Sequence, residues 1–322
     1  VVVPAGSFGD PVLCRADGSA GYLLASVVDD VDLAITHVVR GEDHLTNTAR
    51  QLLIFEALEA APPAFAHLPL LRDSDGRKLS KRDPLGTLDE LVDEAFLPVT
   101  VRRYLAELLG QGAVDLTPPD GTAVALRLER VPTGAPKVDR ARLESLGRED
   151  MANVPLEELL DGTLVDLTDG LAPLVAELAA SAPTRVALRG ELRLVLDGPG
   201  AGDLPHVLAI VLPGREELQR ADAVLQLAVA ELRADPASVG GADTGPVWAA
   251  PFLARYRATG AEQGFGTRDA MRPLRVALTG TSGGPSLELV LGAIGAREAL
   301  RRVQLALLVL EEELSGNQAV DG

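Results

Sequence analysis

Val38-Val39-Arg40-Gly41-Glu42-Asp43-His44-Leu45 and, further on, Lys78-Leu79-Ser80-Lys81-Arg82 are the two stretches that decide the fold. Between them lie a helix-like run at 48–58, a Pro-Pro break and an apolar segment at 65–71. This order of strand, polar turn, helix, strand and basic loop is typical of a β–α–β unit in a parallel sheet. Ligands bind at the carboxyl ends of parallel strands. We therefore expect both polar clusters to lie at one pocket.

The basic loop from Lys78 to Arg82 has two interpretations. Two lysines three residues apart, with Ser80 between them, suit a loop that closes on a polyphosphate. Their ammonium groups would neutralise the charge that develops on leaving phosphates. Short basic segments are usually solvated surface, so the loop by itself is a weak signal for phosphate binding. The loop by itself leaves both interpretations open.

Arg40 follows a strand-like apolar run at 35–39. An arginine at a strand end forms either a structural ion pair, here with Asp43, or a two-pronged contact to a ligand carboxylate. Glu42, Asp43 and His44 are adjacent on a turn, where neighbouring side chains point in different directions. We therefore do not expect these three residues to converge on a metal ion.

Composition is that of a globular protein. Of the 322 residues, 47% are hydrophobic and 24% charged, and no apolar run approaches the roughly 20 residues of a membrane span. The single cysteine, Cys14, cannot build a disulfide framework or a thiolate-rich zinc site, and it favours a reducing compartment, the cytoplasm. We expect Cys14 to be a small buried hydrophobe. A net charge of −17 argues against binding nucleic acid over the whole surface, although a local basic face is compatible with it.

Beyond Arg82 the pattern becomes helical. Thr87 followed by Glu90 predicts a helix start, and two amphipathic helices at 88–95 and 99–109 are separated by Pro98. After Met151 the pattern predicts an all-α region. Its main helical runs are 155–160, 171–180, 216–233, 246–259 and 287–313.

The motifs, in this order and at this spacing, closely resemble those of bacterial glutamyl-tRNA synthetases. They are the run from Asp17 to Asp30, the segment Arg40 to His44, and the basic loop, which looks like the class I signature usually written Lys-Met-Ser-Lys-Ser. The run Arg272 to Gly280, followed by Gly284-Pro285, resembles the end of the family's anticodon-binding region. The resemblance covers most of the chain, although 180–247 matches only in general character.

The resemblance implies an α/β, Rossmann-like nucleotide-binding half-domain followed by mainly α-helical stem-contact and anticodon-binding domains. Residues 1–20 would end an acceptor-stem-binding insertion, and 21–86 would form the second half of the catalytic domain. Residues 87–150 would form the stem-contact domain and 151–322 the helical anticodon-binding region. The first class I signature, commonly His-Ile-Gly-His, does not occur in the sequence. We therefore expect that the N-terminal half of the catalytic domain is missing and that this chain alone is inactive.

The implied function is the ATP-dependent ligation of L-glutamate to tRNA(Glu) through glutamyl-adenylate. ATP would bind as its Mg²⁺ complex, no zinc is expected, and the protein would be a cytoplasmic monomer. Glutamate supplies its own nucleophilic carboxylate, so catalysis would consist of positioning and charge stabilisation. The alternative is a non-catalytic tRNA-binding relative. A short tRNA-modifying paralogue is disfavoured because about half of the chain follows Met151.

The resemblance also assigns roles to individual residues. The catalytic residues would be Lys78, Ser80 and Lys81. The glutamate-binding residues would be Tyr22, Ser26 and Arg40. The residues near ATP and the tRNA terminus would be Gly41, Glu42, Asp43, His44 and Leu79. The tRNA-binding candidates are Arg82, Lys137, Arg140, Arg142, Arg272 and Arg275.

Some positions depart from the family pattern or have a structural alternative. Ser26 stands where many relatives have asparagine, a departure from the family pattern. The basic residues between Lys137 and Arg148 would form either a phosphate-contacting patch or a solvated helix face of mixed charge. Trp248 could stack on an anticodon base, but a lone tryptophan is usually a core residue.

Overall fold

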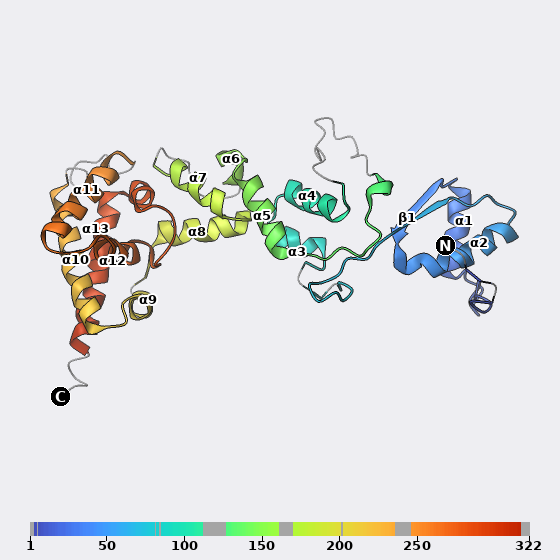
Figure 1. The fold of residues 1–322 in the computed structure, drawn as a ribbon, viewed down its shortest axis with the longest axis horizontal. Helices are drawn as coiled ribbons and strands as arrows, with labels where there is room; N and C mark the ends of the chain where they lie inside the picture. Colours follow the sequence, from blue (N-terminus) through green and yellow to red (C-terminus); the bar gives the residue numbers. More distant parts are fainter. Residues whose placement is uncertain are drawn as a thin grey trace. The chain divides into compact units, whose positions relative to one another are not determined.

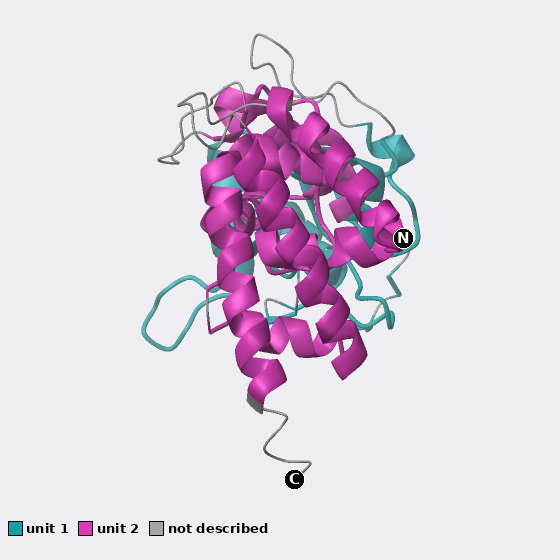
Figure 2. Cartoon of the chain, turned by 90° about the vertical axis from the view of Figure 1, so that its left-hand side faces the viewer, with its two compact units in different colours: residues 1–93, 98–143 teal, residues 94–97, 144–322 magenta. Residues whose placement is uncertain are grey.

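The computed structural model describes residues 3–4, 6–80, 82–83, 85–111, 127–160, 170–200, 202–235 and 246–316. Lys81, one of the predicted catalytic residues, lies outside this description. The chain divides into two compact units, coloured separately in Figure 2. Unit 1 contains residues 1–93 and 98–143, and unit 2 contains residues 94–97 and 144–322.

Unit 1 contains the predicted β–α–β arrangement (Figure 1). Strands β1 (His37–Gly41) and β2 (Ala64–Leu68) pair in parallel, with His37 opposite Ala64 and Gly41 opposite Leu68. They are joined by the short 3-10 helix η1 (Glu42–His44) and helix α2 (Leu45–Ala57). The parallel pairing is confirmed, and it places Arg40 and Gly41 at the carboxyl end of β1.

The core of this region lies between α2 and helix α1 (Tyr22–Asp32). Val27, Ile54 and Phe55 are buried there, each at most 5% exposed. Leu23, Leu24 and Phe65 pack against them. The core side chains of α2 lie on one helical face, but that face also contains the buried polar residues Thr48 and Gln51. These polar groups require hydrogen-bond partners, which determine the geometry of the site.

The remainder of unit 1 contains α3 (Leu88–Asp93), α4 (Pro98–Leu108) and the 3-10 helix η2 (Leu128–Arg130). The backbone N–H of Glu90 donates to Thr87 Oγ1 at 3.3 Å, as expected of a helix start after Thr87. Pro98 does not lie between the helices as predicted. It is the first residue of α4, where a missing N–H has no cost.

Cys14 is exposed, so the prediction that it is a buried hydrophobe is wrong. Its backbone forms an isolated antiparallel bridge with Ala20, and this bridge closes a turn at Asp17 and Gly18. The pattern of apolar residues alone does not indicate which face of such a short segment packs against the rest of the protein.

The described residues of unit 2 form helices joined by turns and loops, without a strand, as the periodicity after Met151 predicts. Helix α13 packs against α10, α11 and α12, and buried leucine, valine and alanine side chains form the core. Gly295 kinks α13, with φ 81° and ψ 163°. Helices α8, α9 and α12 were not predicted. The elements are α5 (Arg140–Met151), which begins in unit 1, α6 (Leu156–Leu159), α7 (Ala172–Ser181), α8 (Arg185–Asp197), α9 (Leu204–Val211), α10 (Arg215–Ala234), α11 (Pro246–Glu262), α12 (Thr267–Thr279) and α13 (Leu287–Gly316).

Among the described helices, none is both long and apolar enough to cross a membrane.

Candidate active site

Arg40 is held from α2 by two neutral side chains. Its Nη2 donates to Oγ1 of Thr48 and to Oε1 of Gln51, each at 2.6 Å. The guanidinium carbon lies 5.4 Å from the centroid of the Phe65 ring on β2. The alternative of an ion pair between Arg40 and Asp43 is wrong, because Asp43 pairs with Lys78 instead. Arg40 therefore keeps its charge uncompensated within the described residues.

Gln51 connects two of the residues predicted to bind glutamate. Its Nε2 donates to Oγ of Ser26 at 2.7 Å, while its Oε1 accepts from Arg40. Gln51 is only 1% exposed. Sequence reasoning missed this residue, although a glutamine on the inward face of an amphipathic helix is a signal that could have identified it.

His67 completes this hydrogen-bonded group from β2. Its Nε2 lies 2.8 Å from Oγ1 of Thr48. Burial, followed by the charge of Arg40, lowers the pKa of His67 below its usual 6.5. His67 is therefore neutral near pH 7 and adds no second positive charge beside Arg40.

Tyr22 lies apart from this hydrogen-bonded group. It is the first residue of α1, its side chain is 54% exposed, and its ring centroid lies 6.2 Å from that of His44. Nδ2 of Asn47 lies 3.2 Å from Nδ1 of His44. Tyr22 is thus near the polar turn and accessible from solvent.

The basic loop and the polar turn after β1 are in contact. Nζ of Lys78 lies 3.1 Å from Oδ2 of Asp43, although the two residues are 35 positions apart. The hydrogen bond from Lys78 lowers the pKa of Asp43. Oε1 of Glu42 accepts a 3.4 Å hydrogen bond from the backbone N–H of Leu70, just beyond β2. The two predicted clusters therefore meet through Lys78 and Asp43.

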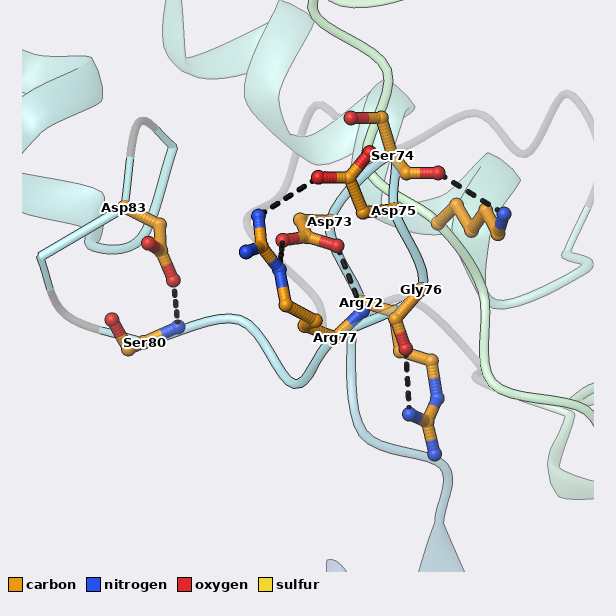
Figure 3. A network of polar contacts seen from close by, with 9 residues as sticks. Arg72, Asp73, Ser74, Asp75, Gly76, Arg77, Ser80 and Asp83 are labelled. Carbon is orange, nitrogen blue, oxygen red and sulfur yellow. Dashed lines mark hydrogen bonds and ion pairs between the residues drawn. The ribbon is translucent and has the colours of Figure 1, made fainter.

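The segment that leads into the basic loop is fixed by its own polar contacts (Figure 3). Arg77 donates to Asp73 at 3.0 Å and to Asp75 at 2.8 Å. The backbone N–H of Ser80 donates to Oδ2 of Asp83 at 2.7 Å. A Cβ built on Gly86 would lie 2.2 Å from the carbonyl oxygen of Ser80. The backbone at position 86 can therefore approach the backbone of Ser80 this closely only because residue 86 is glycine.

The predicted basic patch of unit 1 is only partly available to a ligand. Arg142 forms two hydrogen bonds with Glu107, Nε to Oε2 at 2.9 Å and Nη2 to Oε1 at 2.6 Å. Nζ of Lys137 donates to the carbonyl oxygen of Ser74 at 3.1 Å. Lys137 and Arg140 line a cavity of about 620 Å³ together with Leu79. The backbone N–H of Arg82 donates to Oγ of Ser80 at 3.3 Å.

Arg272 and Arg275 lie on α12 in unit 2 and line a cavity of about 740 Å³. Arg257, Arg268 and the acidic residue Glu288 line the same cavity, so four positive charges face one negative charge in its lining. Arg275 donates to the carbonyl oxygen of Pro285 at 2.7 Å, and burial lowers its pKa. Arg275 thus supports the loop after α12 as well as lining the cavity.

Trp248 is 9% exposed, and its ring lies 5.9 Å from that of Phe252, so it is a core residue. Within the described ranges, no group of three or more His, Cys, Asp or Glu residues could hold a metal ion.

Comparison with known families identifies two regions of the chain. Residues 1–144 match the family described as tRNA synthetases class I (E and Q), catalytic domain. Residues 248–307 match the family described as anticodon binding domain, and they include the arginines of the 740 Å³ cavity.

Curated relatives match nearly the whole chain. Glutamate–tRNA ligase 2 of Gluconobacter oxydans is 36% identical over 303 residues, which are 94% of this chain and 62% of the relative. Glutamate–tRNA ligase 1 of Rubrobacter xylanophilus is 34% identical over 311 residues. The match covers 94% of this chain and 68% of the relative. The chain therefore spans between 62% and 68% of the length of these two relatives.

Among solved structures, a glutamate tRNA ligase from Elizabethkingia meningosepticum in complex with its amino acid has a TM-score of 0.65 to this chain. Sequence identity is 20%, and the match covers 94% of this chain and 63% of the other. At this identity the likeness concerns the fold.

Proposed function

The chain belongs to the glutamate–tRNA ligase family of class I tRNA synthetases, and from this premise we propose that its natural gene product ligates L-glutamate to tRNA(Glu) with ATP. A glutamate carboxylate oxygen attacks the α-phosphorus of ATP, pyrophosphate leaves, and glutamyl-adenylate forms. A hydroxyl of the terminal adenosine of the tRNA then attacks the activated carbonyl and releases AMP. Such chemistry needs positioning and stabilisation of negative charge more than a protein base.

The observation that carries this proposal is the contact between Lys78 and Asp43. It brings the basic loop against the turn at the carboxyl end of β1, where nucleotides bind in parallel α/β sheets. Arg40 lies at the same end of β1, with its charge uncompensated. A cation for a carboxylate and a basic loop for phosphates therefore belong to one part of unit 1, which suits a reaction between an amino acid and ATP.

We assign three groups of residues to the first step. Arg40, Ser26 and Tyr22 bind glutamate, with Arg40 contacting a carboxylate through its guanidinium. The loop residues Lys78, Ser80 and Lys81 act on the ATP phosphates, and Leu79 contacts ATP or the tRNA terminus with the turn residues Gly41, Glu42, Asp43 and His44. ATP carries Mg²⁺, a cation that proteins commonly bind through substrate phosphates.

The tRNA would be bound by residues of both units. The four-arginine cavity on α12 and its neighbours supports an RNA-binding role for Arg272 and Arg275. Arg82, Lys137, Arg140 and Arg142 are the candidates in unit 1. We propose the domain bounds 1–20, 21–86, 87–150 and 151–322, with a Rossmann-like half-domain in the second segment. A monomer in the cytoplasm is part of the same proposal.

The test is tRNA charging with labelled glutamate by the purified natural gene product. Glutamate-dependent charging of tRNA(Glu) is expected, with no charging when ATP is omitted. A protein that binds tRNA but forms neither glutamyl-adenylate nor glutamyl-tRNA would instead be a non-catalytic relative, and the proposal would be wrong.

A further inference from the structure

Gln51 on α2 links Arg40 on β1 to Ser26 on α1. Its side-chain amide is fixed at both ends, with Oε1 toward Nη2 of Arg40 at 2.6 Å and Nε2 toward Oγ of Ser26 at 2.7 Å. Oγ of Ser26 donates its own proton to the carbonyl oxygen of Leu23 at 3.2 Å, so it accepts from Gln51. A flipped amide would set two donors, its NH₂ group and the guanidinium, against each other. The direction of the amide is therefore determined by the network.

Within the described residues, none of the groups that contact Arg40 carries a charge. They are the amide oxygen of Gln51, the hydroxyl of Thr48, the carbonyl oxygen of His44 at 3.5 Å and the face of the Phe65 ring. Nε of Arg40 is buried without a hydrogen-bond partner. Arg40 itself is partly buried. An arginine that is largely removed from water is ordinarily paired with a carboxylate, and Arg40 has no such partner among the described residues. The guanidinium of Arg40 is instead oriented by neutral acceptors, so its positive charge is available to a ligand.

Burial makes this arrangement specific. Gln51 is 1% exposed and Thr48 is 8% exposed, so each must use its polar atoms within the protein. An amide and a carboxylate have nearly the same shape, but only the amide orients Arg40 without neutralising it. A glutamate at position 51 would occupy the same space and form an internal ion pair.

We propose that Gln51, assisted by Thr48, is a positioning residue that keeps Arg40 oriented and uncompensated, so that the site requires a carboxylate on its amino-acid substrate. This inference rests on the proposed function and deepens it, because it names the residue on which the action of Arg40 depends. Gln51 itself need not touch the substrate.

The deciding variant is Gln51→Glu in the natural gene product, assayed by tRNA charging at varied glutamate concentration. We expect the glutamate KM to rise at least tenfold, while kcat at saturating glutamate and the KM for ATP stay within about threefold. Leu53→Glu is the matched control, because it places the same new charge on the same helix at a side chain that is 53% exposed. Its glutamate KM should equal that of the wild type.

A second pair of variants covers the case in which Gln51→Glu does not fold. Thr48→Val keeps the shape and removes the acceptor oxygen, so the glutamate KM should rise. Thr48→Ser keeps the hydroxyl, so its glutamate KM should equal that of the wild type. A merely structural role would change stability, measured by thermal unfolding, without this selective change in glutamate KM.

The outcomes separate this inference from the proposed function. If Arg40→Lys raises the glutamate KM but Gln51→Glu and Thr48→Val do not, Gln51 does not position Arg40, and only this inference is wrong. If none of the three changes the glutamate KM, the role of Arg40 fails and the inference fails with it. If the wild-type protein shows no glutamate-dependent charging, the proposed function itself is wrong.

Discussion

Arg302 is completely buried in α13, and its Nε donates to Oε1 of Glu298, one helical turn earlier, at 2.7 Å. Nη1 of Arg302 donates to the carbonyl oxygens of Val195 at 2.6 Å and Leu278 at 2.7 Å, which lie near the ends of α8 and α12. These carbonyls would otherwise lack partners within their own helices. One guanidinium thus joins three helices of unit 2.

Replacing Arg302 with methionine should destabilise unit 2 on the order of 3–5 kcal/mol, because the carbonyl oxygens of Val195 and Leu278 lose their donor, at roughly 1–3 kcal/mol for each buried group left unsatisfied. Arg301→Met is the matched control. Arg301 contacts the same Glu298, but its side chain is 57% exposed, and we expect about 0–1 kcal/mol. Urea unfolding followed by fluorescence of Trp248, the single tryptophan, measures this unit. Equal midpoints for the two variants would contradict the structural role of Arg302.

Glu298 should contribute to the acid sensitivity of unit 2. Hydrogen bonds from Arg301 and then from Arg302 lower its pKa from 4.5 to about 2. Because the pKa is lowered in the folded state, this stabilisation is complete above about pH 4.5 and is lost as the pH falls toward 2. Glu298→Gln should be less stable than the wild type at pH 7, and the difference should narrow between pH 4.5 and 2. A constant difference across this range would refute the prediction.

Arg40→Lys should weaken glutamate binding by about 1.5–3 kcal/mol, the scale of charged hydrogen bonds, because lysine keeps the charge but loses the fork held by Thr48 and Gln51. The measurement is the glutamate KM in tRNA charging. Arg50→Lys, on α2, is the control and should leave this KM unchanged. An unchanged KM for the Arg40 variant would remove it from the glutamate site.

Lys81→Ala should reduce kcat for glutamate-dependent ATP–pyrophosphate exchange by roughly 10²–10³, the effect of losing one preorganised donor. Transfer from preformed glutamyl-adenylate should suffer much less. Arg77→Gln is the control, because the charge of Arg77 is already compensated by Asp73 and Asp75. Equal losses in both steps for the Lys81 variant would point to loop folding or tRNA docking instead.

The two basic regions should differ in their contribution to tRNA binding. Arg272→Gln, in the 740 Å³ cavity, should weaken binding and reduce the salt dependence of the affinity by about one unit of slope. Arg142→Gln should have a much smaller effect, because Glu107 already compensates this charge. Binding titrations at several salt concentrations distinguish them. A larger effect at Arg142 would show that the Arg142–Glu107 ion pair breaks when RNA binds.

The sequence by itself determined the local elements and their order. Alternation and turn residues predicted β1, α2 and β2 because each is specified within about ten residues, and the polar clusters after the strands indicated where a ligand binds. The motifs pointed to the family. The residue roles in the site and the domain bounds stay predictions.

Tertiary structure decided the partners. Gln51 and Ser26 are 25 residues apart, Lys78 and Asp43 are 35 apart, and Arg302 and Val195 are 107 apart. No periodicity links such pairs, because polar groups find their partners on whichever elements the folded chain brings together. The sequence could therefore predict Arg40 as a carboxylate-binding residue. Only the folded chain shows that neutral partners hold it and leave its charge uncompensated.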